Sequence, residues 1–136
     1  MRLAKEKKTS REIARLAAKF ASEKTGEDIV LMDMKGLSSV CDWFLVVSAS
    51  SSRRLKAISD AIEEGLSKKK IFPLHVEGRT NPSWVLLDYV EVVIHIFYRE
   101  VRGFYGLERL WSDAPRERLD EKCLKKTYQK RSKRSS

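Results

Sequence analysis

The sequence predicts an α+β fold: a single domain in which helices pack on a mixed sheet of about five strands. Three observations predict this fold. Two segments repeat apolar residues at the spacing of an amphipathic helix. Several shorter runs are apolar and rich in β-branched residues, as buried strands are. Along the chain these segments follow the order helix, strand, strand, helix, three strands, helix, which favours α+β over a regular alternation of strands and helices.

The first helix is predicted from Ser10 to Lys24. Thr9 and Glu12 have the spacing of a capping box, in which a hydroxyl and a carboxylate each accept a backbone N–H of the other residue. Gly26 is expected to end the helix, because glycine readily adopts the left-handed conformation that follows many helices. The apolar stripe along this helix consists of Ile13, Leu16, Ala17, Phe20 and Ala21.

Two strands follow, from Ile29 to Met34 and from Trp43 to Ser48. The connection between them is too short for a crossover helix, so we expect these strands to be antiparallel neighbours. The serines at 48–52 then supply the N-cap of a second helix, which ends at the basic run 68–70. The apolar stripe of the second helix consists of Leu55, Ile58, Ile62 and Leu66.

The centre of the fold is the stretch from Trp84 to Trp111, which holds 7 of the 12 aromatic residues. After a short strand at 74–77 and a loop, this stretch begins with strands at 84–89 and 92–98. Both faces of this strand pair are apolar, so we expect it to lie inside the sheet with cover on each side. Its turn, at residues 90–91, is unusual, because a two-residue hairpin turn needs positive φ angles that valine resists.

A third helix is predicted from Arg99, with Gly106 closing it and one further turn reaching Trp111. We expect Pro115 to end the packed domain, because the chain changes character there. Residues 116–126 are expected to form a charged helix outside the domain.

Charge is concentrated at the two ends of the chain. The net charge is +9, yet residues 12–115 contain 14 basic and 15 acidic residues and are nearly neutral. We therefore predict a basic N-terminal arm (1–10), a folded domain (11–115) and a basic C-terminal tail (116–136). Basic arms favour polyanions such as RNA through counterion release. The alternative is that these arms only keep the protein soluble.

A cytoplasmic location without a membrane partner is expected. No apolar run approaches the ~20 residues that a spanning helix needs, and the first residues lack the apolar core of a secretory signal. Two cysteines, Cys41 and Cys123, imply no disulfide framework, so a reducing compartment is expected.

No metal site and no cofactor are predicted. The two histidines and two cysteines lack the paired spacing of zinc ligands, and neither common glycine-rich phosphate loop is present. The nearest approach to a catalytic set is Asp33, Asp42 and Asp88, which lie on or beside strands and are of the type that binds Mg²⁺ in nucleotidyl transfer. Their spacing places no two of them on one strand face. We therefore expect no enzyme and keep a nucleotidyltransferase as the alternative.

His95 lies between apolar residues on a predicted strand. We expect a buried histidine whose polar atoms are satisfied, with Asp88 as its partner across the hairpin. The alternative is a functional histidine.

Three large aromatic side chains are candidates for an exposed patch. Trp84 follows a polar loop at the start of its strand, and Tyr105 and Trp111 lie near helix ends. Aromatic side chains rimmed by charged ones are typical of protein-binding hot spots. Burial in the core is the alternative for each of them.

A long combination of residues in this chain resembles a known family. It joins W-x-L-L-D-Y at 84–89 to H-x-F at 95–97 and to F-Y-x-L-E-x-L-W at 104–111. Together with the earlier string GEDIVLMDMKGLSSVCDWFLVV, this combination is similar to the Iojap-like ribosomal silencing factors over roughly residues 11–115. The chain departs from the family pattern at residues 89–91, where Tyr-Val-Glu replaces the usual Tyr-Gly-Asp.

The resemblance implies an α+β fold related to nucleotidyltransferases but without their active site. It also implies a partner, because members of the family bind the fourteenth protein of the large ribosomal subunit, on the side that meets the small subunit. A protein bound there blocks subunit joining and represses translation under nutrient limitation. A role in large-subunit biogenesis is also associated with the family.

We therefore predict a ribosome-binding domain whose basic arms add weak contacts with ribosomal RNA. The residues predicted to meet the ribosomal protein are Glu77, Trp84, Asp88, Tyr105, Leu107, Glu108 and Trp111. One rival is a general RNA-binding module driven by the arms. A homodimer formed through the same apolar face is a further expectation for the free protein.

Overall fold

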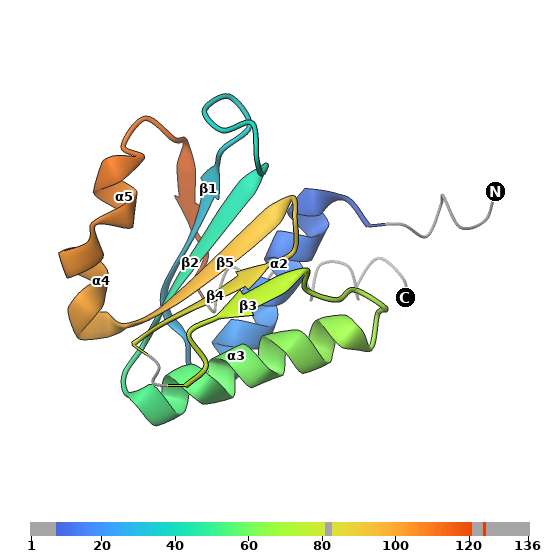
Figure 1. The fold of residues 1–136 in the computed structure, drawn as a ribbon, viewed down its shortest axis with the longest axis vertical. Helices are drawn as coiled ribbons and strands as arrows, with labels where there is room; N and C mark the ends of the chain where they lie inside the picture. The colour runs from blue at the N-terminus through green and yellow to red at the C-terminus, as the bar shows by residue number, and fades with distance from the viewer. Residues whose placement is uncertain (1–7, 81–82, 121–123, 125–136) are drawn as a thin grey trace.

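The computed structural model describes residues 8–80, 83–120 and 124, and in it the chain forms one α+β domain, as predicted. These residues build a mixed sheet of six strands with helices on both faces (Figure 1). The strand order is β3-β4-β5-β2-β1-β6. The helices are α2 (Ser10–Glu23), α3 (Ser52–Ser67), α4 (Arg99–Tyr105) and α5 (Leu107–Leu110). The strands are β1 (Glu27–Asp33), β2 (Trp43–Ala49), β3 (His75–Glu77), β4 (Trp84–Asp88), β5 (Val92–Tyr98) and β6 (Arg116–Arg118).

Helix α2 has a defined cap at each end. The predicted capping box is confirmed: the hydroxyl of Thr9 accepts the N–H of Glu12 at 3.1 Å, and the carboxylate of Glu12 accepts the N–H of Thr9 at 2.9 Å. The end of α2 differs from the prediction, because the left-handed residue is Thr25 (φ 61°) and not Gly26. Gly26 is needed for space, since a Cβ there would lie 2.9 Å from the carbonyl oxygen of Ala21.

The strands pair largely as predicted. β1 and β2 are antiparallel neighbours, and β4 and β5 form an antiparallel hairpin. β5 also runs parallel to β2, with Leu45 opposite Ile94. The hairpin therefore lies inside the sheet, where both faces of β5 are available for packing.

The packed domain extends beyond Pro115, where we expected it to end. Arg116–Arg118 pair with β1 as an antiparallel strand, so the predicted charged helix is wrong at these residues. Leu119 is fully buried, and Leu124 is 7% exposed. The charges of the segment concealed its role, because β6 is an edge strand whose own side chains are exposed.

The sheet separates two apolar clusters. On one face, which we call the helix-covered face, α2 and α3 pack against the sheet through small and aliphatic side chains (Figure 1). The helix residues that this contact buries completely are Ala14, Ala17, Ala18, Ala21, Leu55, Ile58, Ile62 and Leu66.

The opposite face, which we call the open face, is only partly covered. The described helices on it are α4 and α5, which lie on the other side of the sheet from α2 and α3 (Figure 1). Leu86 on β4 and Val93 on β5 remain partly exposed there. The prediction of cover on each side of the hairpin is therefore correct for the helix-covered face and wrong for part of the open face. The fully or nearly buried members of the open-face cluster are Val30, Met32, Met34, Cys41, Val46, Phe97 and Ala114.

The turn between β4 and β5 holds a valine at positive φ. Val90 has a φ of 73°, and its N–H donates to the carboxylate of Asp88 at 2.8 Å. The N–H of Tyr89 donates to the carbonyl oxygen of Val92 at 2.8 Å and closes the turn. These bonds hold a conformation that costs a residue other than glycine about 1–2 kcal/mol.

Candidate functional site

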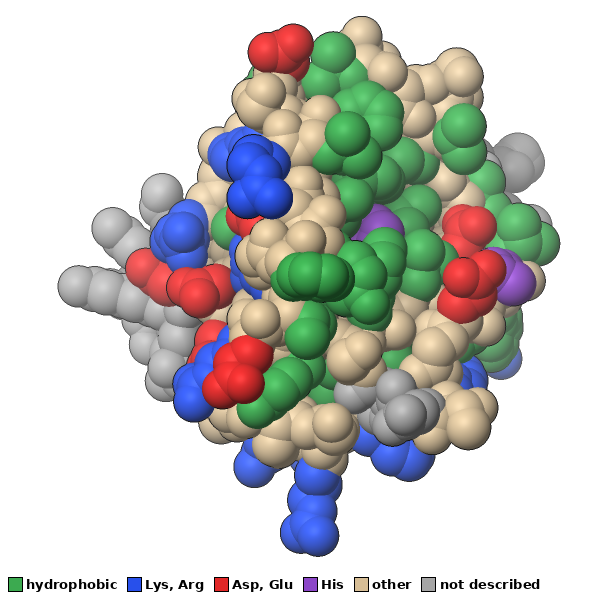
Figure 2. All heavy atoms as spheres, turned by 60° about the vertical axis from the view of Figure 1, so that its left-hand side comes forward, with side chains coloured by type: hydrophobic (Ala, Val, Ile, Leu, Met, Phe, Trp, Pro, Cys, Tyr) green, Lys and Arg blue, Asp and Glu red, His purple; other side chains and the backbone are tan. Residues whose placement is uncertain are grey.

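The candidate site is the open face of the sheet together with α4 and α5. Figure 2 shows hydrophobic side chains gathered on this side of the molecule, with a histidine among them and charged side chains around them. Much of this apolar surface is accessible: Phe104 is 82% exposed, Leu110 74% and Tyr105 46%. Exposed apolar surface with a polar rim is typical of protein-binding sites.

Trp84 lies between a buried ring and an exposed one. Its indole stacks on Phe97, with 5.0 Å between ring centroids, and contacts the ring of Tyr105 on α4 at 4.6 Å. Phe97 is fully buried, whereas Trp84 and Tyr105 keep part of their surface accessible. A rigid base therefore supports two accessible aromatic rings, which is the arrangement expected of binding anchors.

His95 is buried as predicted, but Asp88 is not its partner. Leu86 lies opposite His95 across the hairpin, and the carboxylate of Asp88 instead accepts the N–H of Val90. The Nδ1 of His95 accepts the indole N–H of Trp84 at 3.2 Å. Burial lowers the pKa of His95 to about 4, so its ring is neutral at pH 7.

A nearly buried arginine fastens α4 and α5 to the sheet. Arg102, whose side chain is 11% exposed, donates to both carboxylate oxygens of Glu108 at 2.9 and 3.0 Å. It also donates to the carbonyl oxygen of Asp28 at 2.6 Å and to the hydroxyl of Ser48 at 2.7 Å. The hydrogen bond from Arg102 lowers the pKa of Glu108. Glu108, a predicted site residue, therefore holds α5 in place through its carboxylate.

The end of α5 is supported from the C-terminal strand. Leu107 and Trp111 are half-buried members of the open-face cluster, and the ring of Trp111 meets that of Phe44 edge to face at 6.2 Å. Arg116 of β6 donates to the carbonyl oxygen of Trp111 at 2.8 Å. The same carbonyl also accepts the N–H of Ala114 at 3.0 Å. A segment that we predicted to be a tail thus contacts the end of α5 and stabilises the site.

Glu77 and Asp88, the remaining two predicted site residues, form an acidic edge of the open face. On β3, Glu77 lies opposite Leu86, and His75 lies opposite Asp88. Since side chains alternate along strands, Glu77 and Asp88 share the open face with Trp84. Glu77 is exposed, and its carboxylate lies 2.6 Å from the Nε2 of His75. The structure therefore brings all seven predicted residues to one side of the molecule, on the open face or on α4 and α5.

Sequence reasoning missed several apolar members of this surface. The signal was present in the strand alternation, because every second residue of β4 and β5 points away from the helix-covered face. We instead interpreted both apolar faces as core. The apolar residues of the surface that were not predicted are Phe44, Leu86, Val93, Phe104 and Leu110.

The aspartates considered for Mg²⁺ each bond to a local partner. Asp33 accepts the N–H of Lys35 at 3.0 Å, Asp42 accepts the hydroxyl of Ser10 at 3.1 Å, and Asp88 caps the hairpin turn. Within residues 8–80, 83–120 and 124, no group of three His, Cys, Asp or Glu side chains could hold a metal ion.

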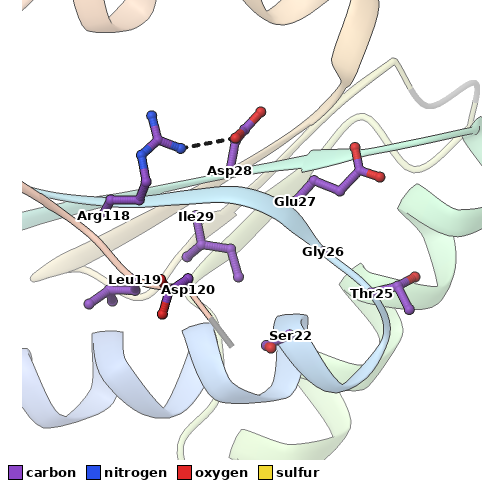
Figure 3. Close-up of a pocket in the computed structure, with 9 residues that line it drawn as sticks. All are labelled: Ser22, Thr25, Gly26, Glu27, Asp28, Ile29, Arg118, Leu119 and Asp120. Carbon is purple, nitrogen blue, oxygen red and sulfur yellow. Dashed lines mark hydrogen bonds and ion pairs between the residues drawn. The ribbon is translucent and has the colours of Figure 1, made fainter. Parts of the chain in front are cut away.

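A hollow of about 370 Å³ lies away from the open face, where α2, β1 and β6 meet (Figure 3). In it Arg118 points toward Asp28, with 2.9 Å between the guanidinium and the carboxylate oxygen. None of the seven predicted site residues lines this hollow.

No helix in the described part of the chain is long and apolar enough to cross a membrane. Most of the two basic arms, residues 1–7, 121–123 and 125–136, lies outside the described residues.

The chain was compared with known families and proteins. A family model described as "Ribosomal silencing factor during starvation" matches residues 7–136. The chain is 37% identical over 110 residues to the "Ribosomal silencing factor RsfS" of Bacillus subtilis, which covers 81% of this chain and 93% of that protein. It is 36% identical over 98 residues to the "Protein Iojap, chloroplastic" of Zea mays, which covers 71% of this chain and 42% of that protein.

The fold is also similar to a solved structure. A crystal structure of a protein from Chromobacterium violaceum superposes with a TM-score of 0.75 at 30% sequence identity. The match covers 77% of this chain and 88% of that one.

Proposed function

Because the chain belongs to the ribosomal silencing factor family, we propose that it binds the large ribosomal subunit through that subunit's fourteenth protein. Bound there, it occupies space that the small subunit needs and so prevents the two subunits from joining. Translation then falls when nutrients are limited. The place of action is the cytoplasm, and the mechanism is steric.

The observation that carries the proposal is the accessible aromatic surface of the open face. Trp84 and Tyr105 keep part of their surface exposed while a fully buried Phe97 fixes their position from below. Rings fixed in this way lose little conformational freedom on binding, so more of their contact energy appears as affinity. We therefore assign Trp84 and Tyr105 as the anchors of the contact.

The chemistry of this surface favours a protein partner over RNA. Its centre is apolar, and the residues at its edge along β3 and the end of β4, Glu77 and Asp88, are acidic. Carboxylates repel phosphates, so RNA does not suit this face. The basic arms add weak contacts with ribosomal RNA in this proposal, and they increase affinity without choosing the partner.

The proposed action needs no catalysis. Asp33, Asp42 and Asp88, the carboxylates that a nucleotidyltransferase would use, are each engaged in a separate hydrogen bond. Calorimetry with Mg²⁺ and a nucleoside triphosphate checks this part directly. Heat of binding that disappears on mutation of Asp33 and Asp42 to Asn favours the nucleotidyltransferase instead.

Sedimentation with purified ribosomal subunits tests the proposal. The protein should sediment with large subunits but not with small ones, and it should reduce the joining of the two. Sedimentation with both subunits alike, or with neither, contradicts the proposal.

Truncation distinguishes our proposal from RNA binding through the arms. Deleting residues 125–136 removes basic charge while leaving the buried Leu124 and strand β6 in place. The truncated protein should still sediment with large subunits, with a weaker dependence on salt. Complete loss of binding supports the RNA-binding module instead.

A second copy of the chain could cover the same face in the free protein. If it does, analytical ultracentrifugation without ribosomes should show a dimer that dissociates when Trp84 is replaced by Ala.

A further inference from the structure

Trp84 has one polar atom, and the structure gives that atom a partner. The indole Nε1 donates to the Nδ1 of His95 at 3.2 Å. Because an indole N–H can only donate, Nδ1 must be unprotonated. The ring proton of the neutral histidine is therefore on Nε2.

This tautomer leaves a buried donor without a partner. His95 is 4% exposed, and no hydrogen-bond partner of its Nε2 is found in the described part of the chain. A buried donor without a hydrogen-bond partner destabilises a fold. Leucine or phenylalanine would fill the position without this cost, so core packing alone does not account for a histidine here.

The imidazole itself is held firmly between aromatic rings. The ring of Phe44 meets it edge to face at 4.7 Å, and that of Phe97 lies nearly parallel at 6.3 Å. The hydrogen bond to Trp84 adds a directional constraint that stacking lacks, because stacked rings can slide and turn. Stacking on Phe97 sets the height of the Trp84 indole above the sheet, and the bond to His95 sets its rotation.

We infer that His95 is a positioning residue of the binding surface: its Nδ1 fixes the orientation of the Trp84 indole, so that the free protein already presents this ring as its partner needs it. The inference rests on the proposed function, in which Trp84 is an anchor. Losing the acceptor lets the indole occupy several orientations, and the partner must then restrict them on binding.

Two substitutions separate positioning from packing. In His95→Asn the side-chain oxygen stands close to the position of Nδ1 and can still accept the indole N–H, although the ring is lost. In His95→Leu the position is filled by an apolar side chain and the acceptor is lost. A purely structural role predicts that the apolar leucine is tolerated better, whereas positioning predicts the reverse for binding.

The affinity for purified large subunits should depend on whether residue 95 can accept the indole N–H of Trp84, and not on how stable the variant is. We expect His95→Leu to bind about tenfold more weakly, as for the loss of about 1.4 kcal/mol, and His95→Asn to bind within about threefold of the wild type. Thermal unfolding of both variants establishes that they are folded at the temperature of the assay. His95→Leu that is folded and binds as tightly as the wild type overturns the inference, as does weakening that follows unfolding temperature in both variants.

A spectrum of the free protein tests the hydrogen bond without the ribosome. The chain has three tryptophans, so a ¹H–¹⁵N spectrum should contain three indole signals, and Trp84→Phe identifies the signal of Trp84. That signal should shift in His95→Leu and exchange faster with solvent, while His95→Asn should keep it near the wild-type position. An unchanged signal in His95→Leu contradicts the positioning role.

The two readouts also separate the inference from the proposed function. Wild-type protein that fails to bind large subunits overturns the proposed function and the docking part of the inference together. The spectrum still decides in that case whether His95 orients Trp84.

Discussion

The two faces of the sheet are built from different side chains. The helix-covered face meets α2 through four alanines, all fully buried, and α3 through leucines and isoleucines. The open face carries the rings of Phe44, Trp84 and Phe97, and next to it the rings on and after α4 and α5 remain partly exposed. Small residues allow the close approach of a helix to the sheet, whereas the large rings project beyond the area that two short helices can cover.

Two tryptophans illustrate the difference. Trp43 belongs to the helix-covered cluster, is 8% exposed and donates to the hydroxyl of Ser10 on α2. Trp84 donates to a histidine of the sheet itself and remains partly exposed. The helix-covered face is therefore closed by the protein's own helices, whereas the open face is the surface to which we assign binding.

The largest effect is expected from a substitution that creates a cavity on the helix-covered face. Leu87 on β4 is fully buried there. Leu87→Ala should lower the free energy of unfolding by about 3 kcal/mol, because it removes buried methyl groups and leaves a void. Urea denaturation followed by circular dichroism measures this loss. A loss below about 1 kcal/mol contradicts the close packing of this face.

The next effect concerns the support of α4 and α5. Arg102→Ala leaves the carboxylate of Glu108 and the carbonyl oxygen of Asp28 without their donor, so we expect a loss of about 2.5 kcal/mol in unfolding free energy. Arg99, on the same helix, is the matched control because its pair with Glu27 is exposed at both ends. Arg99→Ala should cost less than about 0.5 kcal/mol. Equal losses in both variants contradict the role given to Arg102.

The pH dependence of stability should reveal the buried histidine. His95 has its pKa lowered from 6.5 to about 4 by burial, so below pH 6.5 the unfolded chain binds a proton that the folded chain does not. Stability is therefore complete above pH 6.5 and falls toward pH 4. We expect a loss of about 2 kcal/mol between pH 7 and pH 5.

His95→Leu is the control for this prediction. The variant should lack this component, and the difference between the two curves isolates the histidine. Asp33 and Glu108 affect the stability in more acidic solution, because the pKa of each carboxyl group is lowered from its usual value of 3.8 or 4.5. Parallel curves for the two proteins contradict the burial of a neutral histidine.

The smallest effect is a gain in stability at the hairpin turn. Val90→Gly should raise the free energy of unfolding by about 1 kcal/mol, because glycine adopts the positive φ of 73° without strain. Glu91→Gly, one residue later and without a positive φ, should instead lower it by about 0.5 kcal/mol. Thermal melts of the two variants should therefore move in opposite directions.

Local sequence patterns predicted most of the elements, because each leaves a signal near its own residues. The capping box of Thr9 and Glu12, the paired strands β1 and β2, and the break at Gly106 were all correct. The charge of β6 was misleading, because an edge strand can expose every side chain and still pair through its backbone.

Contacts between distant residues were harder to predict. The predicted site residues lie on one side of the sheet, and all but Glu77 come from the single aromatic stretch at 84–111; their role in binding stays a prediction. Arg102 was missed because its partners Asp28 and Ser48 lie on β1 and β2, far from α4 in the sequence. The partner of His95 depends on which residues face each other in the hairpin, and the register places Leu86, not Asp88, opposite it.

The most direct measurement compares two variants on opposite faces of one strand. Trp84→Ala changes the open face of β4, and Leu87→Ala changes the helix-covered face. Both are titrated against purified large ribosomal subunits at a temperature where both remain folded. Our account predicts that Trp84→Ala weakens binding by about 30-fold, or about 2 kcal/mol, while Leu87→Ala, although less stable, binds within about threefold of the wild type. A folded Trp84→Ala protein that binds as tightly as the wild type contradicts the account.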